Sequence, residues 1–210
     1  TLICQLEYLI SFLPNIKIKK NVNYANGEID LIAFSEIENT ALCFQVKSTI
    51  APDSARTVER VTDRVLEGMK QIQEFEKWDA LQKQTLLNKE FEVTLNDTSI
   101  INLLLTRSCA GSTGSWVIND KYKIINYPLF ASIIAQKVKS DDLSIKNINK
   151  EIETAQNDLL SKSKSKVVMD RLQIGKFIIE FPNIYSEFQD IIAINYSTFS
   201  QLKEFEEPHC

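Results

Sequence analysis

The chain has 210 residues, of which 44% are hydrophobic and 25% are charged, and its formal net charge is −4. This is the composition of a globular protein, and the length suits one large domain or one domain with an extension. The negative net charge excludes a protein covered in positive potential, so any nucleic-acid contact would have to come from a local basic patch.

The cysteines and the single histidine disfavour several kinds of active site. The four cysteines show no Cys-x-x-Cys spacing, and His209 is the penultimate residue. A zinc finger, a Cys–His nucleophile pair and a Ser–His–Asp triad within this chain are therefore disfavoured. Cys43 and Cys109 lie in apolar, strand-like runs, which favours buried thiols in a reducing compartment.

Neither a membrane span nor a targeting segment is visible. No stretch reaches the ~18 apolar residues that a transmembrane helix needs, and the chain shows no signal peptide. We therefore expect a cytoplasmic protein without membrane association.

The first part of the chain predicts a helix followed by three strands. Residues 2–13 place leucines and isoleucines at helical spacing, and Pro14 ends that pattern. The alternating stretch 16–22 predicts a half-exposed strand. Residues 27–35 and 41–49 then predict two strands joined by a polar turn.

The central part predicts a long helix and a buried strand. A helix is expected from just after Pro52 to about Trp78, followed by a polar segment, 79–99, with a short helix and loops. Residues 99–106 form a nearly continuous apolar run, as expected of a strand covered on both faces. A loop, a short strand and a helix with proline near its start are predicted next, at 109–115, 116–119 and 128–138.

The pattern changes character beyond Ser140. The predicted elements are, in order, a helix, a basic linker, a strand and a helical tail: 141–161, 161–166, 174–181 and from Tyr185 onward. We therefore expect two parts, a domain over 1–140 and a C-terminal extension over 141–210.

The predicted hairpin gathers polar residues at one corner. Pairing centred on its turn places Asp30 opposite Gln45 and Glu28 opposite Lys47, and cross-strand partners share a face. The other face should carry only apolar side chains: Ile29, Leu31, Ala33, Leu42, Phe44 and Val46.

Such a corner has a chemical use and a simpler alternative. Carboxylate and carbonyl oxygens are the ligands that Mg²⁺ prefers, and a lysine can offset charge on a phosphate. The alternative is an exposed sheet corner with a Glu–Lys cross-strand pair that contributes little to stability.

The segment "GEID" (27–30) followed by "QVK" (45–47) resembles the PD-(D/E)xK nuclease superfamily, which includes restriction endonucleases, Holliday-junction resolvases and Mrr-like enzymes. The resemblance covers roughly residues 2–137. It implies an α/β fold with a restriction-endonuclease-like core, a mixed central β-sheet flanked by helices in the order αβββαβ. An α/β C-terminal extension follows that core.

The resemblance implies roles for individual residues. Asp30 corresponds to the metal-binding aspartate and Lys47 to the catalytic lysine. Gln45 falls where most members have an acid, although Mrr-like members with a QxK motif have the same glutamine. The implied cofactor is Mg²⁺ (or Mn²⁺), held by Asp30, Gln45, the backbone carbonyl of Val46, and Glu7 of the first helix.

Further residues are accessory candidates. Glu28 precedes the aspartate by two residues and could act directly or pair with the lysine. In "QIQEF", Gln71 and Phe75 have the spacing of a glutamine and a tyrosine in RecB-like members. Three arginines of the same helix recur at intervals of four and suit phosphate contact, although acidic neighbours make a solvated face equally compatible: Arg56, Arg60 and Arg64.

The implied function is a metal-dependent endonuclease that hydrolyses phosphodiester bonds, with DNA as the expected substrate and RNA as the alternative, in defence, restriction or repair. Two other functions stay open. One is a catalytically inactive module of the same fold that binds nucleic acid or serves assembly. The other is a protein–protein module that uses residues 141–210. A homodimer or a larger multidomain protein is also left open.

Overall fold

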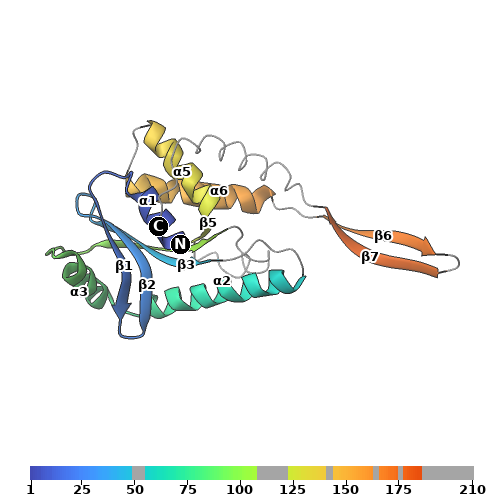
Figure 1. Ribbon diagram of the computed structural model, residues 1–210, viewed down its shortest axis with the longest axis horizontal. Coiled ribbons are helices and arrows are strands. Elements are labelled where there is room, and N and C mark those ends of the chain that lie inside the picture. Colours follow the sequence, from blue (N-terminus) through green and yellow to red (C-terminus); the bar gives the residue numbers. More distant parts are fainter. Residues whose placement is uncertain (49–54, 108–122, 141–143, 163–165, 175–176, 186–210) are drawn as a thin grey trace.

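The computed structural model describes residues 1–48, 55–107, 123–140, 144–162, 166–174 and 177–185. It shows an α/β protein in which a sheet lies between two layers of helices (Figure 1). The elements follow in the order α1 (Leu2–Ile10), β1 (Ile16–Tyr24), β2 (Gly27–Ser35), β3 (Thr40–Lys47), α2 (Ala55–Glu76), α3 (Ala80–Phe91), β4 (Ser99–Thr106), β5 (Lys123–Asn126), α5 (Tyr127–Ser140), α6 (Ile145–Lys162), β6 (Lys166–Ile174) and β7 (Phe177–Tyr185).

The main sheet is mixed and has five strands in the order β1-β2-β3-β4-β5. The first three strands are antiparallel neighbours, whereas β3, β4 and β5 run parallel. The predicted mixed sheet flanked by helices is therefore confirmed, and the expected αβββαβ succession is present with α3 added between α2 and β4.

The two faces of the sheet bury separate cores. On one face α1, α5 and α6 pack over a cluster that we call the α1-side core, which includes Leu6, Phe44 and Phe130. On the other face α2 and α3 cover the α2-side core, which includes Ile32 and Phe75. β3 contributes alternate residues to both cores, which explains its uninterrupted run of buried positions.

The predicted pairing of the β2–β3 hairpin is confirmed where the ladder exists. Ile32 pairs with Cys43 and Leu31 with Phe44. The backbone ladder ends at this last pair, one step before Asp30 and Gln45. Beyond it the side chain of Asp30, rather than its backbone, contacts β3.

One part of the hairpin prediction is wrong, because Ile29 does not share a face with Leu31. Leu31 packs in the α1-side core, whereas Ile29 packs with Val22 in the α2-side core. The β1–β2 register omits the pair of Asn21 with Asp30, and Asn21 has a left-handed backbone with φ 53°. This irregularity in both strands interrupts the alternation of faces, so residues before and after it point to opposite sides.

The predicted boundary at residue 140 does not coincide with a break in packing. Helix α6 buries Ile145, Ile148 and Ile152 in the α1-side core, so its first turns belong to the same body as the sheet. The strand predicted at 174–181 forms parts of both strands of a hairpin, β6 and β7 (Figure 1).

Four other segments either differ in extent or place from the sequence prediction or lie outside the described residues. The weakly patterned segment 79–99 contains a full helix, α3, which begins with a capping box between Asp79 and Gln82. The short strand β5 was not predicted. The strand predicted at 116–119 and the helical tail lie outside the described residues.

The structure describes one of the two thiols that were predicted to be buried, and it describes helices that can be compared with the length of a membrane span. Cys43 is buried, and this burial raises the pKa of its thiol to about 12, which keeps it protonated and unreactive. Cys109 and Cys210 lie outside the described residues. None of the described helices is long and apolar enough to cross a membrane.

A single carboxylate from the β2–β3 turn caps helix α6. Glu38 accepts hydrogen bonds from Ser144 Oγ at 2.7 Å, from Ile145 N at 2.8 Å and from Lys146 N at 3.2 Å. These donors lie at the helix N-terminus, where backbone N–H groups have no partner within the helix and an anion is favoured. The contact joins α6 to the sheet.

We predict that Glu38→Ala destabilises the protein by about 1–2 kcal/mol, the usual cost of a lost N-terminal cap. Urea unfolding measures this change, and the amides of Ile145 and Lys146 should also exchange faster with solvent. The control is Glu36→Ala in the same turn, which removes only an exposed ion pair with Lys17 and should matter little. Equal effects of the two substitutions would contradict the capping role.

Candidate functional site

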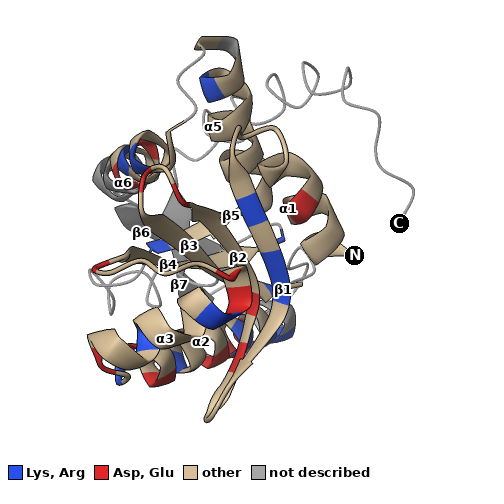
Figure 2. Cartoon of the chain, turned by 90° about the vertical axis from the view of Figure 1, so that its left-hand side faces the viewer, with Lys and Arg blue, Asp and Glu red and all other residues tan. Residues whose placement is uncertain are grey.

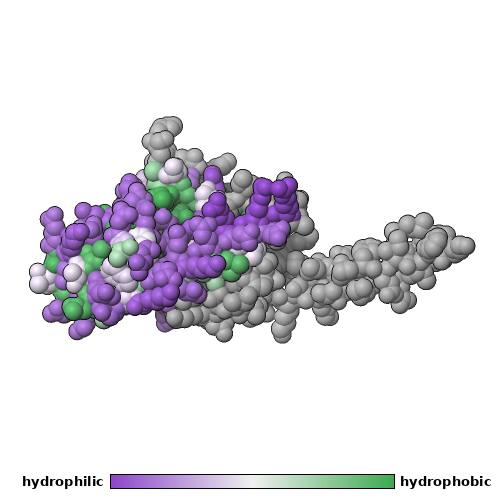
Figure 3. Space-filling model, turned by 90° about the horizontal axis from the view of Figure 1, so that it is seen from below, coloured by the Kyte–Doolittle hydropathy of each residue, from purple (hydrophilic) through white to green (hydrophobic). Residues whose placement is uncertain are grey.

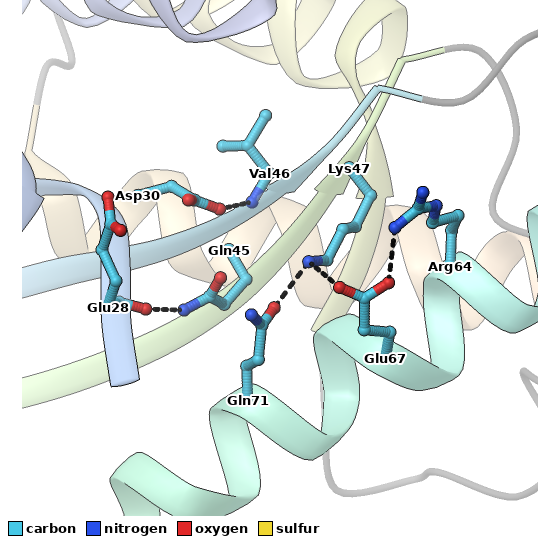
Figure 4. Close-up of polar contacts among 8 residues, drawn as sticks. All are labelled: Glu28, Asp30, Gln45, Val46, Lys47, Arg64, Glu67 and Gln71. Carbon is cyan, nitrogen blue, oxygen red and sulfur yellow. Dashed lines mark hydrogen bonds and ion pairs between the residues drawn. The ribbon is translucent and has the colours of Figure 1, made fainter. Parts of the chain in front are cut away.

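The carboxylate of Asp30 takes the place of the backbone ladder where β2 leaves β3. Asp30 Oδ2 accepts a hydrogen bond of 2.6 Å from Val46 N (Figure 4). This N–H lies beyond the last backbone pair of the two strands, Leu31 with Phe44. The contact fixes Asp30 beside the residue that directly precedes Lys47.

The backbone carbonyl of Val46 points toward the same side. Lys47 O accepts from Arg107 N of the segment that follows β4, so the backbone polar groups of Lys47 face β4. Backbone groups of successive strand residues point in opposite directions, so those of Val46 face β2. The Val46 carbonyl and the Asp30 carboxylate therefore lie on the same side of β3.

Gln45 is buried and only partly satisfied. Its side chain is held by a hydrogen bond of 2.5 Å from Nε2 to the backbone oxygen of Glu28. Its Oε1 is buried and has no hydrogen-bond partner among the described residues. A buried acceptor without a protein partner is rare, and this oxygen has the lone pairs to accept a hydrogen bond or to coordinate a cation.

Lys47 reaches helix α2 rather than Glu28, the cross-strand partner that the sequence suggested. Lys47 Nζ donates to Gln71 Oε1 at 2.6 Å and lies 3.3 Å from Glu67 Oε1. Its side chain is only 12% exposed, so the ammonium depends on these two groups for compensation. Figure 4 shows the lysine extending between β3 and α2.

Burial raises the pKa of the Asp30 carboxyl. The N–H of Val46 and the charge of Lys47 oppose this rise, and the charge of Glu67 adds to it. The net direction is upward because removal from water disfavours the ionised form more than the neighbouring donors favour it. An additional cation beside Asp30 would stabilise the ionised carboxylate.

The structure does not bring Glu7 into contact with the other predicted residues. Its helix covers the α1-side core, and Glu7 Oε2 forms an ion pair with Lys20 Nζ at 2.6 Å. The side chain of Lys47 contacts α2, which covers the other face of the sheet from α1. Glu28 lies beside Asp30 in Figure 4 and supplies its backbone oxygen to Gln45.

The three arginines lie on α2, which carries both signs of charge (Figure 2). Arg56 and Arg60 are exposed. Arg64 Nη1 donates to Glu67 Oε2 at 2.8 Å, so this arginine is linked through Glu67 to Lys47. Figure 3, seen from the side of α2, shows a mainly hydrophilic face over the described residues.

Sequence reasoning missed two residues of the site. Glu67 was treated as part of a solvated face, although it lies one turn before Gln71 and therefore on the same side of the helix. Thr106 pairs with Lys47 in the parallel register, and its buried Oγ1 has no hydrogen-bond partner among the described residues. No sequence signal distinguished Thr106 from an ordinary strand end.

A metal at this corner would rest mainly on neutral oxygen ligands. Among the described residues, no three His, Cys, Asp or Glu side chains are grouped closely enough to hold an ion. The oxygen donors that these neighbouring residues offer are the Asp30 carboxylate, Gln45 Oε1 and the Val46 carbonyl. This set fits Mg²⁺, which is commonly held by one or two carboxylates and keeps several waters or substrate oxygens.

Comparisons with protein-family models, with curated proteins and with solved structures found no match to this chain. The interpretation of the site therefore depends on its own geometry.

We predict that Asp30→Asn stabilises the metal-free protein at neutral pH. Asparagine can still accept the hydrogen bond from Val46 N, and it removes a charge that folding disfavours. Because the pKa of Asp30 is raised in the folded state, the native protein should lose stability relative to the variant as pH rises above the ordinary carboxyl pKa of about 4 toward neutral. The two proteins should converge at lower pH, where both side chains are neutral.

Thermal unfolding in EDTA across this pH range tests the prediction. A lower melting temperature of Asp30→Asn at pH 7 would show that the ionised carboxylate stabilises the corner, contrary to the direction of its pKa shift.

Gly68 allows α2 to approach the strands beneath it. A Cβ at this position would lie 2.5 Å from Leu104 Cδ1 and 3.2 Å from Lys47 Cε. Gly68→Ala should therefore destabilise the protein by roughly 1–3 kcal/mol through overpacking, although alanine has the higher helix propensity. Urea unfolding measures this change against Gln73→Ala, an exposed position of the same helix. A stabilised Gly68→Ala protein would contradict the close approach.

Proposed function

We propose that the corner formed by Asp30, Gln45, Val46 and Lys47 is the active site of a metal-dependent endonuclease that hydrolyses phosphodiester bonds in DNA. One observation carries this proposal: the half-buried carboxylate of Asp30 is fixed to the backbone directly before a lysine whose side chain is only 12% exposed. A carboxylate that could bind a metal ion and an ammonium that could bind a phosphate thus lie at adjoining positions. Metal-dependent phosphodiester hydrolysis uses such a pair of groups.

The metal ligands in this proposal are Asp30, Gln45 and the backbone carbonyl of Val46. When bound, Mg²⁺ or Mn²⁺ would supply positive charge beside the scissile phosphate. The raised pKa of Asp30 and the unpartnered Oε1 of Gln45 support a cation here, because both groups gain a favourable partner from it.

Lys47 acts on the phosphate in this proposal. Its ammonium offsets the negative charge that develops as the bond breaks, in a place that the side chains of β3 and α2 keep largely free of water. Gln71 orients the ammonium through the 2.6 Å hydrogen bond from Lys47 Nζ. The resemblance suggested an accessory part for Gln71, and this contact supports it.

Glu7 has a conditional role. Its carboxylate is paired with Lys20, so a contribution to metal binding requires that this ion pair break. The arginines of α2 recur at intervals of four residues, so they share one side of the helix with Arg64, which is linked through Glu67 to Lys47, and in this proposal they contact the nucleic-acid backbone. Defence, restriction or repair would each use such an activity.

A second candidate function is an inactive module that binds nucleic acid without cutting it. It is favoured by Gln45, a neutral residue whose amide nitrogen is already committed to Glu28. With glutamine in place of an acid, the site has one fewer negative charge for a metal. Both the endonuclease and the inactive module would bind nucleic acid, but only the endonuclease would cleave it.

We predict that the protein nicks or cleaves plasmid DNA with Mg²⁺ or Mn²⁺ and that Asp30→Asn and Lys47→Gln each reduce the rate by about 100-fold or more. Gel electrophoresis of the products measures this rate. The control is Lys89→Gln, which removes an equal charge from a lysine that is 79% exposed on α3, and it should cleave like the native protein.

Cleavage that survives both substitutions would remove the activity from this corner. Binding of DNA without cleavage in either metal would favour the inactive module.

A further inference from the structure

The carboxylate of Glu67 lies between two cations that come from different elements. Its Oε1 is 3.3 Å from Lys47 Nζ of β3, and its Oε2 accepts a hydrogen bond of 2.8 Å from Arg64 Nη1 of α2 (Figure 4). Each carboxylate oxygen of Glu67 thus contacts one of the two cationic side chains. A phosphodiester also presents two non-bridging oxygens that share one negative charge, and lysine and arginine are its usual partners.

The three side chains differ in their access to solvent. Lys47 is 12% exposed, whereas Glu67 is 46% and Arg64 is 64% exposed. An anion from solution can therefore reach Arg64 and Glu67 directly. Of the two groups that contact the ammonium of Lys47, Glu67 is exposed and Gln71 is only partly exposed, so the carboxylate of Glu67 lies on the more open approach to the ammonium.

The surroundings favour an anion at this place. The pKa of Glu67 is lowered, first by the hydrogen bond from Arg64 and further by Lys47, while partial burial opposes the shift. A position that stabilises a carboxylate also stabilises a phosphate, because both are singly charged oxygen anions.

We propose that Glu67 occupies, in the free protein, the place of a nucleic-acid phosphate between Lys47 and Arg64, and that the backbone of the substrate displaces it. This inference rests on the proposed function, since it concerns the same lysine. Glu67 then has two effects. It keeps Lys47 compensated when no substrate is present, and it weakens binding because its charge has to be moved away from the arriving phosphate.

The inference sets Glu67 apart from the other acids of α2. A general charge effect would make any acid on this helix equally unfavourable for a polyanion. Displacement singles out Glu67, which contacts both cations. Asp63 lies one turn before Glu67 on α2 and is exposed, so it carries the same charge at a similar distance from an approaching nucleic acid.

The test is a binding measurement in EDTA, with fluorescence anisotropy of a labelled double-stranded oligonucleotide. Glu67→Gln should bind about 3- to 10-fold more tightly than the native protein, because a like charge next to the phosphate has been removed. Asp63→Asn should change the affinity less than about twofold. Adding Arg64→Gln to Glu67→Gln should abolish the gain.

Equal affinities of Glu67→Gln and Asp63→Asn would overturn the inference, as would the absence of binding by every variant. Glu67→Ala serves as a second variant, since it removes the oxygens as well as the charge and should bind at least as tightly as Glu67→Gln. The measurement needs no cleavage. A protein that binds as expected but never cuts DNA would disprove the endonuclease and leave this inference standing.

Discussion

The hydrogen bond from Val46 N to the carboxylate of Asp30 lies where β2 and β3 separate, and the arrangement of the candidate site depends on it. A strand that leaves its neighbour exposes backbone groups that have to find other partners. Here a side chain provides the partner, so the strands can diverge without leaving Val46 N unsatisfied. The carboxylate is held in place as a consequence, and the Val46 carbonyl is left facing the same side.

The strands separate beside an irregularity in the pairing of β2 with its other neighbour, β1. Asn21 adopts a left-handed backbone, which asparagine tolerates better than most residues, and the pairing of β1 with β2 is interrupted there. The strand residues that follow turn their apolar side chains toward α2. Asp30 lies between Ile29 and Leu31, whose side chains point to opposite faces of the sheet, and it has no backbone pair in β1 or β3. A local irregularity in β1 therefore positions a charged group of β2.

Much of the fold was predictable, because most of it follows from apolar periodicity. The pairing of Ile32 with Cys43 followed from two apolar strands around a polar turn, and the structure confirms it. The face of Ile29 was predicted wrongly, because strict alternation of side chains cannot reveal the irregular pairing at Asn21 and Asp30. A short helix was expected within 79–99, and the capping box of α3 explains where it begins, whereas β5, which was not predicted, has only four residues and a weak pattern.

The candidate site was predictable in its strand residues and, through the resemblance, in Gln71, but not in Glu67. Asp30 and Lys47 stand out because charge interrupts a buried run. Glu67 and Gln71 lie on a helix rich in charge, where no periodicity marks the side that faces a lysine. Only the packing of α2, allowed by the missing side chain at Gly68, shows that these two residues meet Lys47.

The balance of charge in the corner connects its two halves. Asp30 and Glu67 carry negative charge, Lys47 and Arg64 carry positive charge, and the four together are close to neutral. A cation beside Asp30 would make the corner positive and attract a phosphate, and a phosphate beside Lys47 would make it negative and attract a cation. Each ligand then strengthens the binding of the other, because such coupling between two sites is reciprocal. In a chain whose net charge is −4, this coupling would let a nearly neutral corner hold a polyanion more tightly when the metal is present than when it is absent.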